Sequence, residues 1–247
     1  MAVNDLAGAP NGAKEDNVCG RYALLSSMEQ VRDRFAPGQA LLLLPTRYNI
    51  APTQPVIVVH SESGRPALEP MRWGLVPFWS KDPTMGARLI NARAETLAEK
   101  PAFRGPLMRR RCLIPASGFY EWKGSGSSKQ PYFIHLRDRR LFAFAGLYDE
   151  WPSPDGSPLR TCAIVTVEPN ALIAPIHTRM PAILRDWDED LWITPGFVPA
   201  ARVMHALAPM PEDLMAMDPV SCYVNSARNE GPECLRPAGS LLAGLGY

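Results

Sequence analysis

The sequence has almost no net charge and no cysteine pair of the kind that binds metal. Its 247 residues include 26 Lys and Arg against 25 Asp and Glu, a formal charge of +1. The field of the whole molecule therefore predicts no polyanionic partner, and any nucleic-acid binding must come from a local patch. Five cysteines without a C-x-x-C spacing fit neither a disulfide framework nor a zinc site. We expect reduced thiols, with no bound metal and no cofactor.

Long apolar runs are also missing. No span of 18 apolar residues exists, and the N-terminus lacks the hydrophobic core of a signal sequence. These absences predict a cytoplasmic protein without a membrane partner; a DNA-binding function would place it at the nucleoid if it is bacterial. Residues 1–18 carry almost no large apolar side chains, and such a segment buries too little surface to order itself. We expect this leader to be disordered or removed.

What the sequence does contain is many short elements, in keeping with its 26 prolines. From residue 111 to 168, strand-like segments alternate with turn-rich linkers, which is typical of an antiparallel meander. Ser27 and Gln30 form a capping box for a helix that Pro37 and Gly38 end. Further helices are expected after a strand end at 89–96, reaching about residue 100, and near 170–176, 186–193 and 199–207, with a last strand at 220–224.

Neither an internal repeat nor a long linker divides the chain. The pattern predicts the α+β class, a single domain with curved, mostly antiparallel sheets and flanking helices.

Cys19 stands out among the cysteines because Gly20 and Arg21 follow it. Glycine leaves the backbone beside the sulfur open to a substrate, and arginine can hold an anion through two nitrogens. The alternative is a small buried thiol at the start of a first strand, since free cysteine is among the most buried residue types. Cys112 and Cys162 open apolar strand-like runs, and we expect both to be inert.

Glu121 lies between Tyr120 and Trp122 in an otherwise apolar and aromatic strand. A carboxylate in such surroundings loses hydration, which raises its pKa and suits it to acid–base catalysis. Strand alternation equally allows the side chain to point to solvent. Both interpretations stay open.

His177 and Asn91 are two further polar candidates. His177 lies in a loop just before Arg179 and Pro181, where it is either a surface hydrogen-bonding residue or a catalyst. Asn91 lies at a strand-to-helix junction, where it could serve only as a cap.

Phe78 and Trp79, beside prolines, form either a stacking surface or half-exposed packing. The basic run 109–111 is expected to be a solvated face.

Taken together, several motifs resemble the SOS-response-associated peptidase (SRAP) family, from Cys19 to about Pro237. They are CGRY, YNIAPTQ, RWGLVPFW, INARAET, SGFYEW, IHTRMPAIL and a late Val224-Asn225. The resemblance implies an SRAP domain at 19–237, built as an open barrel, after the leader at 1–18 and before a tail at 238–247. Members of that family sense abasic sites in single-stranded DNA. Their terminal cysteine forms a stable thiazolidine with the ring-opened aldehyde of the site.

The resemblance also implies roles for particular residues. Cys19 would be the nucleophile, Asn91 would position its α-amine, and Glu121 and His177 would handle protons. The expected phosphate-binding residues are Arg21, Arg93 and Arg179. Those expected to line the DNA channel are Asn49, Pro52, Phe78, Trp79 and Pro181. The expected partner is single-stranded DNA with an abasic site, bound by a monomer with little sequence preference. The expected activity is a suicide, lyase-like crosslinking with cysteine-type self-processing.

The chemistry explains why the cysteine must be terminal. An α-amine has a pKa of about 8, so part of it is neutral at pH 7 and attacks the aldehyde to give an imine. The thiol of the same residue then adds to the imine carbon, and closing a ring within one residue has a large effective concentration.

One feature departs from the family pattern, because 18 residues precede Cys19. An amide nitrogen cannot form the imine. Self-cleavage of the Val18–Cys19 bond, trimming by a host protease, or a true start at Val18 would each free the amine. We favour the third hypothesis, because the leader carries no structural signal.

Two other functions stay open. One is a cysteine hydrolase acting in trans with Cys19, His177 and Glu121. The other is a nucleic-acid-binding barrel without catalysis.

Overall fold

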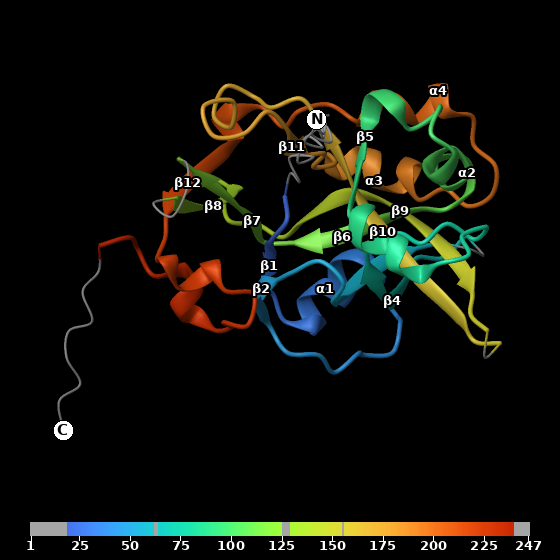
Figure 1. Cartoon of the computed structure of the whole chain (residues 1–247), viewed down its shortest axis with the longest axis horizontal. Coiled ribbons are helices and arrows are strands. Elements are labelled where there is room, and N and C mark those ends of the chain that lie inside the picture. The colour runs from blue at the N-terminus through green and yellow to red at the C-terminus, as the bar shows by residue number, and fades with distance from the viewer. Residues whose placement is uncertain (1–18, 62–63, 125–128, 155, 240–247) are drawn as a thin grey trace, which may run out of the picture.

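Two β-sheets form the body of the protein (Figure 1). The computed structural model describes residues 19–61, 64–124, 129–154 and 156–239. The first sheet has five strands in the order β12-β8-β7-β1-β2, and all its pairings are antiparallel. Its strands are β1 (Tyr22–Leu24), β2 (Arg47–Ile50), β7 (Gly118–Lys123), β8 (Gln130–Leu136) and β12 (Met215–Pro219).

The second sheet closes on itself. Its strands are β3 (Pro55–His60), β4 (Ala67–Trp73), β6 (Arg111–Ala116), β9 (Phe142–Pro152) and β10 (Pro158–Val167). Strand β10 pairs in parallel with β4 and antiparallel with β9, so the ring β10-β4-β3-β6-β9 is complete. The predicted class is therefore confirmed, and the barrel goes beyond the prediction because its ring of pairings closes.

Two short strands pair with the carboxyl-terminal half of β10. Strand β5 (Asn91–Arg93) runs parallel to β10, and β11 (Met180–Pro181) runs antiparallel to it. Thr166 pairs with Arg93 of one and with Pro181 of the other. One strand thus sets the places of two segments that are far apart in the sequence.

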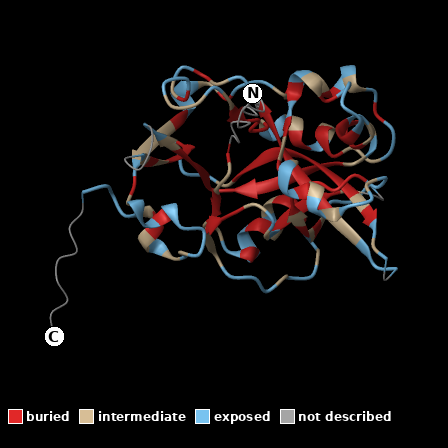
Figure 2. Ribbon diagram, in the orientation of Figure 1, coloured by how far each residue is buried: buried red, intermediate tan, exposed pale blue. Residues whose placement is uncertain are grey.

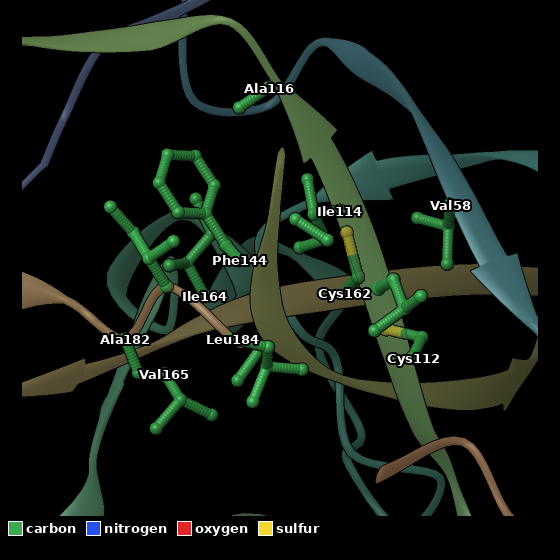
Figure 3. Packing of buried hydrophobic residues seen from close by; sticks show 14 of the residues in the cluster. Val58, Cys112, Ile114, Ala116, Phe144, Cys162, Ile164, Val165, Ala182 and Leu184 are labelled. Atoms are coloured by element: carbon green, nitrogen blue, oxygen red, sulfur yellow. The ribbon is translucent and has the colours of Figure 1, made fainter. Parts of the chain in front are cut away.

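Apolar side chains fill the barrel (Figures 2 and 3). Cys112 and Cys162 are fully buried among them, and burial raises the pKa of both thiols. Gly146 faces Cys112 across the β6–β9 pair, and a Cβ there would lie 2.8 Å from the sulfur. These two cysteines are packing residues, as predicted.

The helices are short and lie outside the barrel. Helix α1 (Met28–Phe35) has the predicted capping box: the Ser27 side chain accepts from the Gln30 backbone N–H, and the Gln30 side chain accepts from the Ser27 backbone N–H. The others are α2 (Pro101–Arg109), α3 (Asp186–Trp192) and α4 (Ala200–Val203). The 3-10 turns are η1 (Pro83–Arg88), η2 (Ala94–Thr96), η4 (Met204–Ala206), η5 (Glu212–Leu214), η6 (Cys222–Asn225) and η7 (Pro232–Leu235). In the part of the chain described, no helix has the length and apolar character needed to cross a membrane.

Three predicted elements are wrong. Residues 171–176 form turns: the Asn170 side chain accepts from the Ile173 amide as a helix cap does, but Pro175 has no N–H to continue the backbone hydrogen bonds. After β5 only the turn η2 forms, since Lys100 before Pro101 is extended and the helix begins at that proline. Residues 220–224 are not a strand, because the Ser221 side chain caps η6.

The basic run at 109–111 is not a uniformly solvated face. Arg111 is only 3% exposed, and its guanidinium donates to the carbonyl oxygens of Leu107 (2.8 Å) and Trp192 (2.6 Å). Arg110 forms an ion pair with the buried Asp149. The sequence shows only a run of like charges. It does not show which of these arginines bind acceptors inside the fold.

Candidate active site

Cys19 meets Glu121 at the start of β1. Strand β1 pairs antiparallel with β7 through Tyr22 and Phe119, so the residues before β1 lie beside the second half of β7. The Cys19 backbone N–H donates to Glu121 Oε1 at 2.7 Å. Cys19 is fully buried and Glu121 is 5% exposed. The strand therefore does not point Glu121 to solvent, and acid–base catalysis by this residue stays a prediction.

The backbone turns sharply at Cys19. Its φ is +46°, in the left-handed region that residues other than glycine seldom adopt. Such a conformation persists only when its surroundings enforce it, and such residues cluster at functional sites. Here the hydrogen bond to Glu121 and the pairing of β1 enforce it.

Burial controls the electrostatics of this pair. It raises the pKa of Glu121 to about 7, and the hydrogen bonds from the backbone of Cys19 and Trp122 and the charge of Lys129 only partly oppose it. Burial also raises the pKa of the Cys19 thiol, and the nearby Glu121 charge raises it further. Glu121 therefore gains and loses a proton near neutral pH, whereas the thiol stays protonated.

Asn91 begins β5, a strand linked to β1 by two contacts. The Tyr22 ring packs edge-on against Trp73, with centroids 5.4 Å apart, and Trp73 Nε1 donates to the Ile90 carbonyl at 2.9 Å. Tyr22 is three residues after Cys19, and Ile90 directly precedes Asn91. Asn91 itself pairs with Ile164 of β10 and caps no helix.

His177 lies half-buried in the loop before β11. The Arg179 backbone N–H donates to His177 Nδ1 at 3.1 Å. Since that nitrogen accepts, the neutral ring carries its proton on Nε2. The ring is thus arranged to donate through its other nitrogen.

The Arg179 side chain is held by protein groups. Its two terminal nitrogens each lie 2.8 Å from one oxygen of Glu95, and one of them also donates to the Thr166 carbonyl at 2.6 Å. Pro181, two residues on, is buried in β11. Of the three predicted phosphate-binding arginines, Arg93 is the exposed one.

Arg21 and Asn49 connect the site to the C-terminal part of the chain. Arg21 donates to Asn49 Oδ1 at 2.7 Å and to the Val224 carbonyl at 2.9 Å. Asn49 is fully buried, and its Nδ2 donates to the carbonyls of Ser226 (2.9 Å) and Asn229 (2.8 Å). Asn49 thus ties β2 to residues 224–229 and orients Arg21 rather than facing an open surface.

The remaining predicted residues lie farther along the surface. Phe78 is 60% exposed and Trp79 is 48% exposed, as a stacking surface requires, and the Phe78 amide donates to buried Asp149 at 2.9 Å. Pro52 is half-buried. A groove of about 720 Å³ opens beside Phe78, and neither Cys19 nor Glu121 lines it. Among the described residues, no group of three or more His, Cys, Asp or Glu could hold a metal ion.

Sequence reasoning missed three residues around the site. Glu95 holds Arg179, Trp122 lies under the Arg21 guanidinium at 5.7 Å, and Glu230 ion-pairs with Arg47 and accepts from the Asn49 amide at 3.1 Å. Glu95 belongs to the motif INARAET and Trp122 to SGFYEW, but the sequence predicted no role for either residue. No local signal marks Glu230, because its partners are about 180 residues away in the chain.

The chain is similar to known proteins over most of its length. The family described as "SOS response associated peptidase (SRAP)" matches residues 18–227. The abasic site processing protein YoqW of Bacillus subtilis is 43% identical over 224 residues, covering 88% of this chain and 99% of the relative. The abasic site processing protein HMCES of Gallus gallus is 40% identical over 202 residues, covering 72% of this chain and 59% of that protein.

Solved structures agree on the fold. A protein from Bacteroides thetaiotaomicron superposes with a TM-score of 0.80 at 28% identity, covering 89% of this chain and all of that one. A phage-related protein from Bordetella bronchiseptica gives 0.66 at 32% identity, covering 82% of this chain and 94% of that one.

Proposed function

Because the chain belongs to the SOS response-associated peptidase family, we propose that it recognises abasic sites in single-stranded DNA and bonds to them through Cys19. The observation that carries this proposal is the contact of 2.7 Å between the Cys19 nitrogen and the buried Glu121 carboxyl. This contact brings the nitrogen and sulfur of Cys19 together with the acid of Glu121, which can exchange a proton. Curated relatives over nearly the whole chain are named abasic site processing proteins.

The reaction starts from a free Cys19 α-amine next to Glu121. The ammonium gives a proton to the Glu121 carboxylate, and the neutral amine attacks the aldehyde carbon of the opened sugar. Protonated Glu121 then gives its proton to the departing hydroxyl, so that water leaves and an imine forms. The Cys19 sulfur adds to the imine carbon while its proton passes to the nitrogen, which closes the thiazolidine. The high pKa of the thiol favours its entry as a neutral S–H group after the imine has formed.

Asn91 and His177 act around this centre in the proposal. The side-chain amide of Asn91, at the start of β5, orients the amine. His177 donates from Nε2 to a sugar oxygen and so assists opening of the sugar ring.

The DNA follows the exposed side of the site. Arg93 neutralises a phosphate, while Arg21 and Arg179 add positive charge from held positions. Phe78 and Trp79 stack on bases, with Pro52 and Pro181 at the channel wall. One monomer occupies one abasic site.

Wherever the Val18–Cys19 bond is present, including in a chain that starts at Val18, we also propose that the protein itself can open it. The Cys19 sulfur attacks the Val18 carbonyl carbon and gives its proton to the Glu121 carboxylate. The C–N bond then breaks, and Glu121 passes that proton to the departing nitrogen. Water then hydrolyses the thioester, which frees the thiol and leaves the amine ready. The hydrogen bond of Cys19 N–H to Glu121 and the left-handed φ at Cys19 support this step.

A denaturing gel tests the crosslink. Wild-type protein is mixed with a single-stranded oligonucleotide bearing one abasic site, alongside Cys19→Ala, Cys19→Ser and the control Cys222→Ala at an exposed cysteine. We expect a 1:1 adduct with the wild type and the control only. Repeated turnover without an adduct would instead support the hydrolase. Equal binding of intact and abasic strands by wild type and Cys19→Ala would support the barrel without catalysis.

Intact mass tests the origin of the amine. Purified full-length protein incubated alone should lose residues 1–18, and Glu121→Gln should retain them. Trimming that requires a cell extract would support a host protease. A native product beginning at residue 18 or 19 without any longer precursor would support a start at Val18. A protein that keeps residue 1 and still crosslinks would contradict the amine mechanism.

A further inference from the structure

Glu95 occupies a position that the proposed mechanism does not use. It lies in the turn η2 (Ala94–Thr96) directly after β5, and both of its oxygens accept from the Arg179 guanidinium at 2.8 Å. The same guanidinium reaches the Thr166 carbonyl at 2.6 Å. Arg179 therefore joins three segments: the turn after β5, strand β10 and the loop before β11.

The contact continues to His177 through the backbone of the same residue. While the Arg179 side chain binds Glu95, its N–H donates to His177 Nδ1 at 3.1 Å. The Arg179 side chain is only 12% exposed, so this arrangement has little room to rearrange. Moving the guanidinium away from Glu95 would release the backbone that fixes the imidazole.

The charge of Glu95 has the wrong sign for a residue that serves DNA affinity. Burial alone would raise its pKa, but the hydrogen bonds and charge of Arg179 outweigh burial and the pKa lies below its ordinary value. Glu95 is thus an anion at neutral pH, beside a surface proposed to hold phosphates. A carboxylate there repels DNA, and it neutralises one of the cations that would attract it.

We infer that Glu95 is a positioning residue of the crosslinking reaction, which holds the 177–181 loop so that His177 meets the sugar. This inference rests on the proposed function and assigns Glu95 a place in it. A bidentate carboxylate–guanidinium pair fixes orientation as well as distance, which suits this task. A small misplacement of a reacting group lowers rate far more than it lowers binding.

The test separates rate from affinity. Full-length wild type, Glu95→Gln, Glu95→Ala and the matched control Glu99→Gln, an exposed glutamate four residues on, are compared. Crosslinking is timed at saturating abasic oligonucleotide, and affinity is measured with the same strand bearing an unreactive tetrahydrofuran site. We expect a saturating rate about 10- to 100-fold lower for both Glu95 variants. Affinity should be unchanged or tighter, and Glu99→Gln should equal wild type. A saturating rate within twofold of wild type, or a loss confined to affinity, would overturn the inference.

Two further measurements keep the result interpretable. Sodium formate should partly restore the rate of Glu95→Ala, compared with sodium chloride at equal ionic strength, because Glu95 is half exposed and a free carboxylate can enter. Hydrogen exchange of the Arg179 amide should be faster in Glu95→Gln than in Glu99→Gln, and equal exchange would contradict the positioning role. If wild type forms no adduct, the proposed function fails, while the exchange result still decides whether Glu95 holds the loop.

Discussion

Two glutamates flank the site in opposite environments. Glu121 lies in the middle of β7, buried, with the Cys19 amide as its contact, and burial raises its pKa to about 7. Glu95 lies in a turn, half exposed and paired with Arg179, and its pKa lies below the ordinary value. The same side chain thus becomes a group that exchanges protons in one place and a permanent anion in the other. A buried glutamate whose burial outweighs nearby positive charge, such as Glu121, is suited to proton transfer. A glutamate paired with an arginine in fixed geometry, such as Glu95, is suited to positioning.

The comparison predicts its largest effect on the rate of crosslinking. Glu121→Gln keeps an acceptor for the Cys19 nitrogen but cannot carry the proton, so we expect the rate to fall by about 100-fold or more. Glu95→Gln should lose less at the same pH. Timed denaturing gels between pH 6 and 8 measure both variants, each prepared with Cys19 as its first residue so that removal of the leader does not limit the rate. If Glu121→Gln reacts as fast as Glu95→Gln, the two glutamates do not differ in role.

Stability against pH gives the next effect, measured in a Cys19→Ala background, which lacks the nucleophile and therefore keeps the bond after Val18. A carboxyl whose pKa is raised on folding contributes full stability below its unfolded pKa, and that contribution is lost as pH rises through the folded pKa. For Glu121 the shift from 4.5 to about 7 corresponds to about 3 kcal/mol. Urea unfolding at pH 5 and pH 8 should show Cys19→Ala losing most of this amount relative to the double variant Cys19→Ala/Glu121→Gln. Equal pH slopes for the two proteins would mean that Glu121 is not desolvated in the fold.

Removing Arg179, the cation paired with Glu95, should lower the free energy of unfolding by a smaller amount. Arg179→Met leaves Glu95 unpaired and the Thr166 carbonyl without its donor, so we expect a loss of about 1–2 kcal/mol in the free energy of unfolding. Arg179→Lys should recover only part of it, because a single ammonium cannot replace the planar fork. Urea unfolding at pH 7 measures these differences. Full recovery with lysine would show that charge alone matters here.

The smallest expected effect is the acid sensitivity of the Glu95 pair. A carboxyl with a depressed folded pKa contributes stability above its unfolded pKa, and the contribution is lost as pH falls through the folded value. Because Glu95 is half exposed, we expect less than about 1 kcal/mol, reduced by salt. Comparing Glu95→Gln with wild type between pH 6 and pH 3 at two salt concentrations measures it. A salt-independent difference would mean that the pair is more deeply buried than its exposure indicates.

Local signals predicted the local parts of the fold. The capping box of Ser27 and Gln30 gave α1, and the run of short strands gave the antiparallel meander. The closed barrel depends on the parallel pairing of β4 with β10, about 90 residues apart, and no periodicity within either strand records that partner. The expected helix at 170–176 failed for a local reason, since Pro175 has no backbone N–H to continue the hydrogen bonds that begin at Asn170.

The site shows the same division. Motif resemblance singled out Cys19 and Glu121, and the structure places them in contact. The role of Asn49 could not be read in advance, because its three carbonyl partners come from residues 224–229. Glu95 belonged to a motif, yet only the approach of Arg179 from 84 positions away gives it a partner. Chemistry can be inferred from residue type, whereas positioning requires the fold.

Strand β10 has a consequence for when the protein becomes competent. Both β5 and β11 are registered on it, and its own pairing with β4 joins residues about 90 positions apart across the middle of the chain. Long-range pairings of this kind form slowly and only after the intervening chain exists. At about 5–20 residues per second, synthesis of the chain from Cys19 to the end of β11 at Pro181 takes about 8–32 seconds, so the Cys19 segment waits that long for β10 and β11. Cys19 is synthesised early, whereas the strand that positions β5 and β11 is synthesised late. An incomplete chain therefore carries Cys19 without the segments that are proposed to assist its reaction.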